Sequence, residues 1–216
     1  MSVDNTNTSE NGGYAKMKPK YAGYEAKKSG GYIQLPPEGS YIGQIQAVRV
    51  EKTYDKTHDQ LVLLLDITEG EYANRYTEQY NDAKERYPDT KNKGVFRIAI
   101  PEENDPAELA WMKSKFEGSL WAVEQSNPGY AWDWDEKKLA GKKVGFSVRK
   151  SFYTGKDKDG NPVDRETTEI GRLESIDEVK AGKVKPMQPR DSRTNKTDDN
   201  GTDSYADVTG SVEVPF

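Results

Sequence analysis

Alternating and continuous apolar positions predict strands in the first half of the chain. Residues 41–49 alternate between apolar and polar side chains, which is the period of a half-buried strand. Residues 61–67 (LVLLLDI) form an apolar run that is too short for a helix and predicts a central strand. Residues 94–100 (GVFRIAI) predict a third strand, ended by Pro101. The segment 72–93 between the last two strands is polar and aromatic, and we expect an insertion made of loop or irregular helix.

A helical stripe follows the third strand. Asp105, Pro106 and Glu108 form a start signal, with a capping residue, proline in the first turn and an acid three residues after the cap. Apolar residues then recur at spacings of three and four, which predicts an amphipathic helix that ends at 127–129 (NPG). The stripe consists of Leu109, Met112, Phe116, Leu120 and Val123.

Two more strands complete the pattern. Residues 144–148 alternate again, 155–162 form a polar hairpin turn, and 163–173 form the last strand before a short helix near 176–179. The order β-β-β-α-β-β contains no βαβ unit. It is the order of the OB-fold, a Greek-key barrel that binds oligonucleotides. The sequence therefore predicts a mainly β fold, a five-stranded OB-fold barrel with one helix between strands 3 and 4.

The 216-residue chain divides into a folded middle and two polar ends. Only 33% of residues are hydrophobic and 32% are charged, which is too polar for one packed globule, yet aromatic residues make up 10%. We expect a flexible N-terminal segment at 1–38, the OB-fold domain at 39–183, and a disordered acidic tail at 184–216.

Several protein classes are excluded by residue usage. The chain has no Cys, so it has neither disulfides nor thiol-based sites, and its single His, His58, excludes multi-His metal centres. No apolar run approaches the ~18–20 residues of a membrane span, and the N-terminus lacks the apolar region of a signal peptide. These features predict a soluble protein of the cytoplasm with no membrane partner.

Charge is unevenly distributed along the chain. The formal net charge is -5, but residues 137–158 hold eight basic groups and one acid. The last twenty residues hold five acids and no base. Because local charge steers a polyanion more than the total does, this basic stretch is compatible with a nucleic-acid partner.

Catalytic motifs are weak. Every Gly-Lys pair is followed by Lys, Val or Asp, so no phosphate-binding loop is present, and no cofactor or metal site is predicted. The sequence DKDGN at 157–161 resembles a calcium loop, but the glycine falls at the fourth position, and a hairpin turn explains it better. His58 lies in a polar turn.

A metal-dependent nuclease or resolvase remains an alternative, because its carboxylates need no fixed spacing. Its candidate ligands are Glu102, Glu103, Asp105, Asp133 and Asp135.

Basic and aromatic side chains interleave along the fourth strand and its hairpin. Single-strand binders combine a basic groove with aromatic rings on which bases stack. By alternation, Arg149 and Tyr153 should share a face opposite Val144, and Arg97 should point outward from its strand. An ordinary basic strand edge is the simpler alternative. The candidate DNA-binding residues are Arg49, Lys52, Tyr54, Arg97, Lys143, Arg149, Lys150, Phe152, Tyr153, Lys156, Lys158 and Arg165.

The end of the chain returns to apolar character after a polar, acidic stretch. Such a tip fits a docking peptide, in which Phe216 fills a pocket on a partner and its carboxylate pairs with a basic group. The candidate partner-binding residues are Glu213, Val214, Pro215 and Phe216. Of the two tryptophans at 132 and 134, one is expected in the core, because the acids beside them would repel phosphate.

These features together resemble the phage-encoded single-stranded DNA-binding proteins, whose acidic tails end in Pro-Phe. The resembling segments are 39–52, 61–72, 126–145 and 170–183, together with the tail ending at 213–216. The resemblance implies an OB-fold that coats single-stranded DNA in replication and recombination without catalysis, and a tail that recruits replication or recombination proteins. Self-association into a homo-oligomer is left open, as is a protein-interaction module that does not bind DNA.

Overall fold

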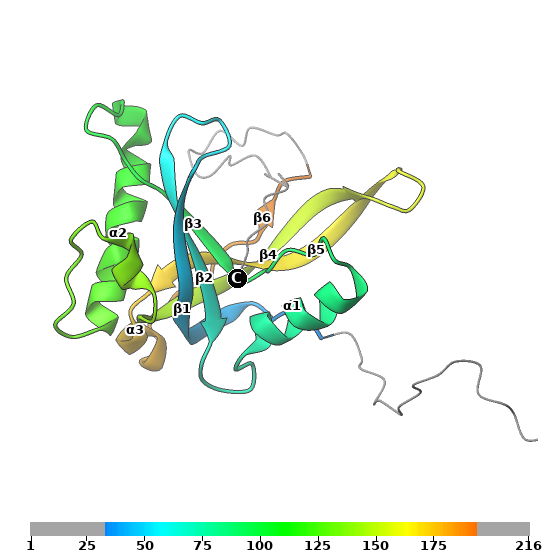
Figure 1. Cartoon of the computed structure of the whole chain (residues 1–216), viewed down its shortest axis with the longest axis horizontal. Coiled ribbons are helices and arrows are strands. Elements are labelled where there is room, and N and C mark those ends of the chain that lie inside the picture. Colours follow the sequence, from blue (N-terminus) through cyan, green and yellow to red (C-terminus); the bar gives the residue numbers. More distant parts are fainter. Residues whose placement is uncertain (1–32, 194–216) are drawn as a thin grey trace, which may run out of the picture. The chain divides into compact units, whose positions relative to one another are not determined.

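An antiparallel sheet dominates a mixed α/β fold in the computed structural model, which describes residues 33–193 (Figure 1). The five strands and the helix expected from the sequence are all present, with ends that differ by a few residues. The strands are β1 Gly39–Lys52, β2 Asp59–Ile67, β3 Val95–Ala99, β4 Lys143–Lys156, β5 Pro162–Glu174 and β6 Arg190–Asp191. The helices are α1 Arg75–Arg86, α2 Ala110–Ser126 and α3 Ile176–Lys180, with 3-10 turns at Ala107–Leu109 and Glu136–Leu139.

β1 is the strand that joins the two halves of the sheet. The strand order is β3-β2-β1-β4-β5, and β1 pairs with β4 through residues 39–44 and with β2 through residues 43–52. A register shift between Ile45 and Ala47 bends β1 where it passes from one partner to the other. Gly43 lies at this crossing, where an added Cβ would stand 2.3 Å from the carbonyl oxygen of Asp66. The close approach of the two strands therefore requires glycine there.

The barrel expected from the sequence is not closed. Within residues 33–193 no hydrogen-bonded ladder joins β3 to β5, although Cα atoms of these strands come within 8 Å of one another. β3 has only five residues, and β5 stays paired with β4 as the two strands run out into a long hairpin that projects from the body (Figure 1). The sheet is therefore open on this side.

The core fills the inner face of the sheet and is closed by α2. Every second residue of β2 points inward, as the continuous apolar run allows, and α2 adds the apolar stripe that its spacing predicted. Each such side chain contributes roughly 1.5–3 kcal/mol when fully buried. The main contributors are Ile45, Leu61, Leu63, Leu65, Ile67, Phe96, Ile98, Phe116, Leu120, Val123, Val144 and Phe146.

The insertion at 72–93 forms the regular helix α1. Its first turn is capped from a neighbouring strand, because the carboxylate of Asp66 on β2 accepts hydrogen bonds from the backbone N–H groups of Tyr76 (3.1 Å) and Thr77 (3.0 Å). The Tyr76 ring is fully buried and lies 6.4 Å from the Phe146 ring, between ring centroids. One buried aromatic residue and a capping carboxylate thus fix this polar helix to the sheet.

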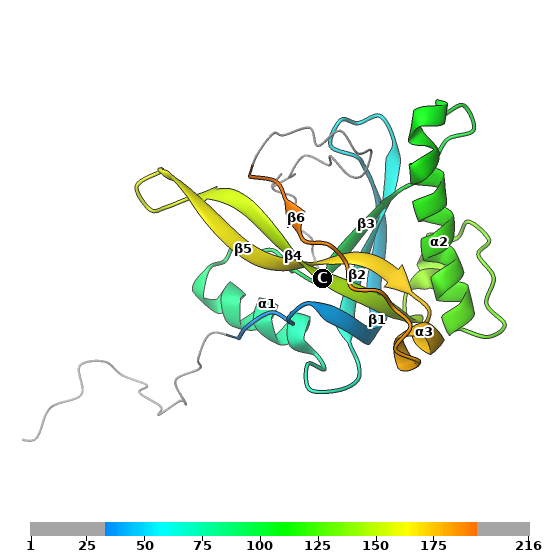
Figure 2. The same ribbon diagram turned by 180° about the vertical axis from the view of Figure 1, so that it is seen from behind.

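The folded unit extends beyond both ends that the sequence analysis gave it. Pro36, in the segment expected to be flexible, is buried, and its carbonyl accepts a hydrogen bond from Thr168 Oγ1 at 2.9 Å. At the other end, β6 pairs with the edge of β4 in parallel and Ser192 N–H donates to Phe152 O at 2.9 Å (Figure 2). Residues 184–193 therefore belong to the folded unit, whereas the expected tail from 194 onward lies outside the described residues.

The helix start expected at Asp105 is also different. A 3-10 turn at Ala107–Leu109 precedes α2, and the Asp105 carboxylate accepts from Glu102 N–H and His58 instead of capping the helix. In the part of the chain that is described, no helix has both the length and the apolar character needed to cross a membrane.

Candidate nucleic-acid interface

The outer face of β1, β2 and β3 carries two of the predicted arginines in one row. The strand register places Arg49 opposite Val62 and Val62 opposite Arg97, so all three side chains emerge on the same face. Val62 is only 5% exposed, whereas the Arg97 side chain is 50% exposed. A buried valine side chain therefore lies between the two arginines of this row. Arg97 points outward from its strand, as its alternation predicted.

Glu51 connects these arginines, and the sequence analysis did not identify it. Its Oε2 lies 2.7 Å from Arg49 Nη2, and its Oε1 lies 3.3 Å from Arg97 Nε. Gln60 Nε2 also donates to Glu51 Oε1, at 3.2 Å. Because Arg97 is 46 residues away along the chain, only the register of the sheet brings these groups together.

The same end of the sheet carries Lys52 and Tyr54. Lys52 Nζ lies 2.9 Å from the Asp59 carboxylate, which ties the ends of β1 and β2 together. Tyr54 follows in the loop and is 71% exposed. A tyrosine ring this open to solvent beside a basic face is available for base stacking.

The predicted residues of the β4–β5 hairpin are divided between its two faces. Arg149 and Tyr153 share one face, as alternation predicted, and Tyr153 pairs across the hairpin with Arg165. Lys150 and Phe152 lie on the other face. Lys156 ends β4, and Lys158 is exposed in the turn that follows it. A single strand of DNA lying on one face of this hairpin would therefore contact only part of the set.

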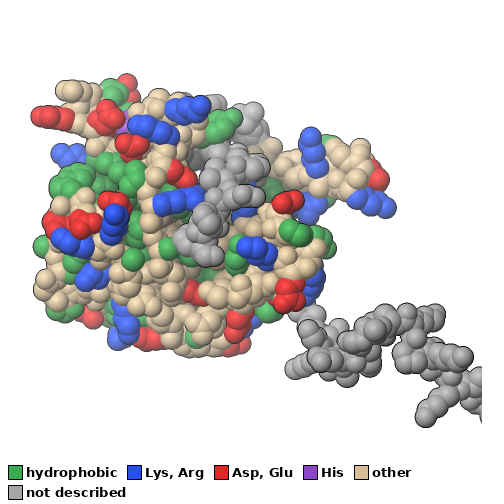
Figure 3. Space-filling view, in the orientation of Figure 1, with side chains coloured by type: hydrophobic (Ala, Val, Ile, Leu, Met, Phe, Trp, Pro, Cys, Tyr) green, Lys and Arg blue, Asp and Glu red, His purple; other side chains and the backbone are tan. Residues whose placement is uncertain are grey.

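The acids of β5 neutralise much of the basic stretch at 137–158. Arg149 Nε lies 2.9 Å from Glu169 Oε1, and Lys150 Nζ lies 3.2 Å from Glu166 Oε1. Across β4, the turn and β5, seven basic residues face six acidic ones. On the face drawn in Figure 3, basic and acidic side chains are interspersed, including on the projecting hairpin. The local excess of positive charge seen in the sequence is therefore largely cancelled in the fold.

Phe152 is covered by the segment that leads out of β6. The Arg193 guanidinium lies 4.8 Å from the centroid of the Phe152 ring and also contacts Asp191 and Asp164, at 2.5 Å and 3.7 Å. The hydrogen bond from Arg193 lowers the pKa of the Asp191 carboxyl to about 2. One face of a predicted stacking ring is thus occupied by a residue of this chain.

Lys143 lies apart from the candidates on the β4–β5 hairpin. It opens β4, at the end opposite the hairpin, and its backbone bonds to Asn127 at the end of α2. With a rise of about 3.3 Å per residue, the fourteen-residue strand separates it from Lys156 by roughly 40 Å. Lys143 was a candidate because it lies on the same strand as the hairpin residues, but its position at the far end of that strand places it away from them.

The tryptophans divide as expected. Trp132 packs against the core, and its backbone N–H donates to Glu124 Oε1 at 2.7 Å. Trp134 is exposed and stacks on Phe116 with ring centroids 5.8 Å apart. Trp134 has a left-handed φ of 68°, a strained conformation for a bulky residue.

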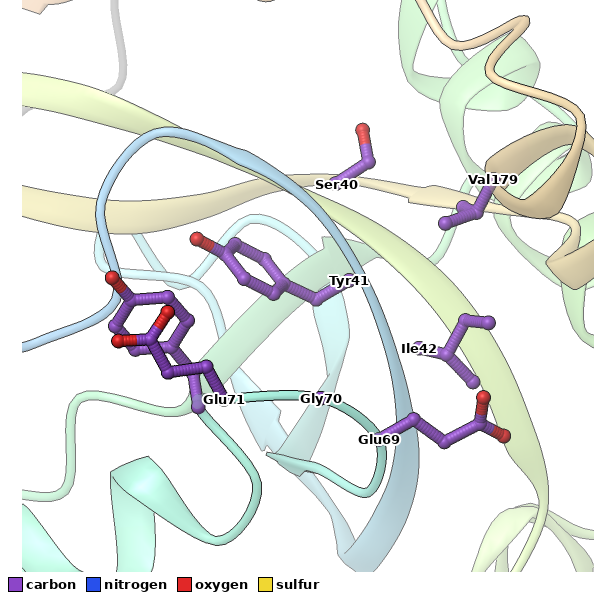
Figure 4. A pocket seen from close by; sticks show the side chains of 8 residues that line it. Ser40, Tyr41, Ile42, Glu69, Gly70, Glu71 and Val179 are labelled. Atoms are coloured by element: carbon purple, nitrogen blue, oxygen red, sulfur yellow. The ribbon is translucent and has the colours of Figure 1, made fainter.

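A shallow pocket of about 380 Å³ opens near the start of β1 (Figure 4). Tyr41 and Tyr72 meet edge to face at 5.9 Å between centroids, and Glu69 and Glu71 contribute carboxylates. Burial, with the nearby Tyr72 and Glu71, raises the pKa of Tyr41 to about 12. None of the predicted DNA-binding residues lines this pocket, and its acids would repel a phosphate.

His58 is a structural link between two loops. The ring is largely buried, with Nε2 2.8 Å from Asp105 Oδ1 and Nδ1 2.8 Å from Thr57 Oγ1. An ionised carboxylate accepts only, so Nε2 carries the proton in this pair. The bond from His58 lowers the pKa of Asp105, and the N–H of Glu102 adds to this effect. Among residues 33–193, no group of three or more His, Cys, Asp or Glu side chains is arranged to hold a metal ion.

Comparison of the chain with models of protein families and with curated proteins finds no match.

Proposed function

We propose that the protein binds single-stranded DNA without sequence preference and without catalysis, as the phage-encoded proteins that its sequence resembles do. The observation that carries the proposal is the row formed by Arg49, Val62 and Arg97 on the outer face of β1–β3, with Tyr54 exposed at the same end of the sheet. Cations that contact phosphates, next to an aromatic ring that stacks on bases, are the two components of sequence-tolerant single-strand binding.

The topology supports the same proposal. The strand order β3-β2-β1-β4-β5, with α2 between β3 and β4, is that of an OB-fold opened between β3 and β5. Oligonucleotides bind OB-folds on the face of strands 2 and 3 and at the loops that follow strands 1 and 4. In this chain Arg97 lies on that face and Tyr54 lies in the first of these loops.

In the proposed mode of binding, the guanidinium groups contact the sugar–phosphate backbone while a base stacks on the exposed ring of Tyr54. Arginine suits this role because its planar fork forms two parallel hydrogen bonds to a phosphate. Stacking tolerates any base, since every base has a π-face. No group on this surface needs to transfer a proton or hold a metal for the DNA to be bound.

A titration of the full chain with oligo-dT at two salt concentrations tests the proposal. We expect Trp and Tyr fluorescence to be quenched and the affinity to fall steeply with salt, because counterions are released from the DNA. A flat salt dependence, or no quenching, contradicts it. Absence of binding at low salt would favour a protein-interaction module. Cleavage of labelled DNA with Mg²⁺ that is lost on substitution of Asp or Glu residues would favour the nuclease.

We further propose that the tip formed by Glu213, Val214, Pro215 and Phe216, which lies outside the described residues, recruits replication or recombination proteins. Deletion of residues 211–216 should leave the affinity for oligo-dT intact and abolish recovery of partner proteins in a pull-down from host lysate. A collapse of DNA affinity in the truncated chain would instead place the tip in the DNA-binding surface.

A further inference from the structure

The carboxylate of Glu51 occupies the centre of the proposed binding face. Three donors from three strands converge on it, namely Arg49 at 2.7 Å, Gln60 at 3.2 Å and Arg97 at 3.3 Å. Its side chain is only 24% exposed, and that of Arg49 only 25%. This arrangement resembles the contacts that a phosphate group would make, because a carboxylate and a phosphate both present anionic oxygens to a guanidinium fork.

Electrostatics explains why the free protein needs such a group. Two guanidinium groups that reach the same point repel one another, and both are partly withdrawn from water over Val62. Glu51 offsets this repulsion and accepts from Gln60 Nε2 as well. Arg49 Nε is buried and forms no hydrogen bond within residues 33–193.

We propose that Glu51 is an internal counter-ion that stands in for a DNA phosphate and sets the affinity and salt dependence of the site. The inference rests on the proposed function. In the free protein Glu51 holds Arg49 and Arg97 in place on the sheet. When DNA binds, a backbone phosphate takes over at least one guanidinium group, and the carboxylate turns to solvent or is left facing the DNA.

This competition has two measurable consequences. The negative carboxylate beside the phosphate weakens binding, so neutralising it strengthens binding. In addition, a released Glu51 leaves an unpaired negative charge near the phosphates, and salt screens the repulsion between them. Glu51 therefore makes the slope of log K against log salt shallower.

The test compares the wild-type chain with Glu51→Gln in oligo-dT titrations between low and high salt. We expect Glu51→Gln to bind roughly three- to tenfold more tightly at about 0.1 M salt, with a steeper slope. The matched control is Glu69→Gln, which changes the net charge equally but lies beyond the opposite end of β2. It should shift neither quantity. If thermal unfolding shows that Gln at this position disturbs the fold, the titration uses Glu51→Thr, because threonine also suits a strand.

The outcomes separate the inference from the function on which it rests. Wild-type binding with unchanged affinity and slope in both Glu51 variants overturns the role of Glu51 and leaves the DNA-binding proposal standing. An equal gain in Glu69→Gln also overturns it, since the effect is then one of net charge. No salt-dependent binding by the wild-type chain refutes the proposed function, and the inference with it. In the double variant Glu51→Gln/Arg97→Gln, the gain should shrink, because Arg97 is the group that Glu51 restrains.

Discussion

The guanidinium group of Arg193 lies 4.8 Å from the centroid of the Phe152 ring and so covers one face of it. A base that stacks on that face must first displace Arg193 from its contacts with Asp191 and Asp164. Tyr54 has no such cover and is 71% exposed. The two aromatic residues, which looked equivalent along the sequence, therefore differ in what they offer to DNA.

We expect Tyr54→Ala to weaken binding to oligo-dT by about 1–3 kcal/mol, the usual loss for one stacked base. Phe152→Ala should weaken it by less than about 0.5 kcal/mol, because its covered ring makes little contact with DNA. Fluorescence titrations of both variants at one salt concentration measure the difference. Equal losses would mean that residues 184–193 leave β4 when DNA binds.

The capping of α1 by Asp66 gives a prediction about stability. Asp66 accepts from the N–H groups of Ile67, Tyr76 and Thr77, and it is almost fully buried. In Asp66→Asn an amide N–H₂ faces one of these donors, so we expect a loss of about 1–3 kcal/mol in the free energy of unfolding. The urea-unfolding midpoint reports this loss. Asp82→Asn, which breaks only the surface pair with Arg86, should cost about 0.3–0.5 kcal/mol.

The sequence predicted those features whose pattern lies within one helix or strand, and it missed those that depend on contacts with another element. Strands were found from local alternation or from a short apolar run, and α2 from its apolar stripe, because these patterns lie within one element. α1 was missed as a regular helix because its cap, Asp66, lies in another element, ten residues before the Tyr76 N–H group that it accepts from. Residues 184–193 looked like tail because their composition is polar, whereas the backbone of Arg190 and Asp191 pairs with β4.

The candidate site was predicted in part for the same reason. Alternation placed Arg97 on an outer face, but only the pairing of β1, β2 and β3 brought it to Glu51 and Arg49. Counting charges along 137–158 missed the acids that β5 sets against them, such as Glu166 and Glu169. Sequence patterns thus report on faces of single elements, while the strand register decides which charges meet.

The hydrogen bond between His58 and Asp105 predicts a pH dependence of stability. The pKa of Asp105 is lowered first by the hydrogen bond from His58 and then by that from Glu102 N–H. Its carboxylate therefore contributes stability that is fully present above the unfolded pKa, about 3.9, and is lost as the pH falls through the lower folded value. In Asp105→Asn this contribution is absent, so unfolding free energy should fall less steeply below about pH 4.

Urea titrations at pH 7, 4 and 3 measure this difference. Asp89→Asn, a substitution at an exposed position between α1 and β3, serves as the control and should keep the acid dependence of the wild-type chain. If the unfolding free energy of the Asp105→Asn variant falls towards acid pH as steeply as that of the wild type, the pair with His58 does not cause the loss of stability at low pH.

The placement of the binding face is tested by two single-charge substitutions that the sequence analysis treated alike. Arg97 lies on the outer face of β1–β3, whereas Lys143 opens β4 beside the end of α2. If the phosphates follow the proposed face, Arg97→Gln removes one phosphate contact and makes the slope of log K against log salt shallower by about 0.7. Lys143→Gln removes the same charge from the molecule and should leave the slope unchanged. A larger effect at Lys143 would move the DNA to the other end of β4, away from Tyr54.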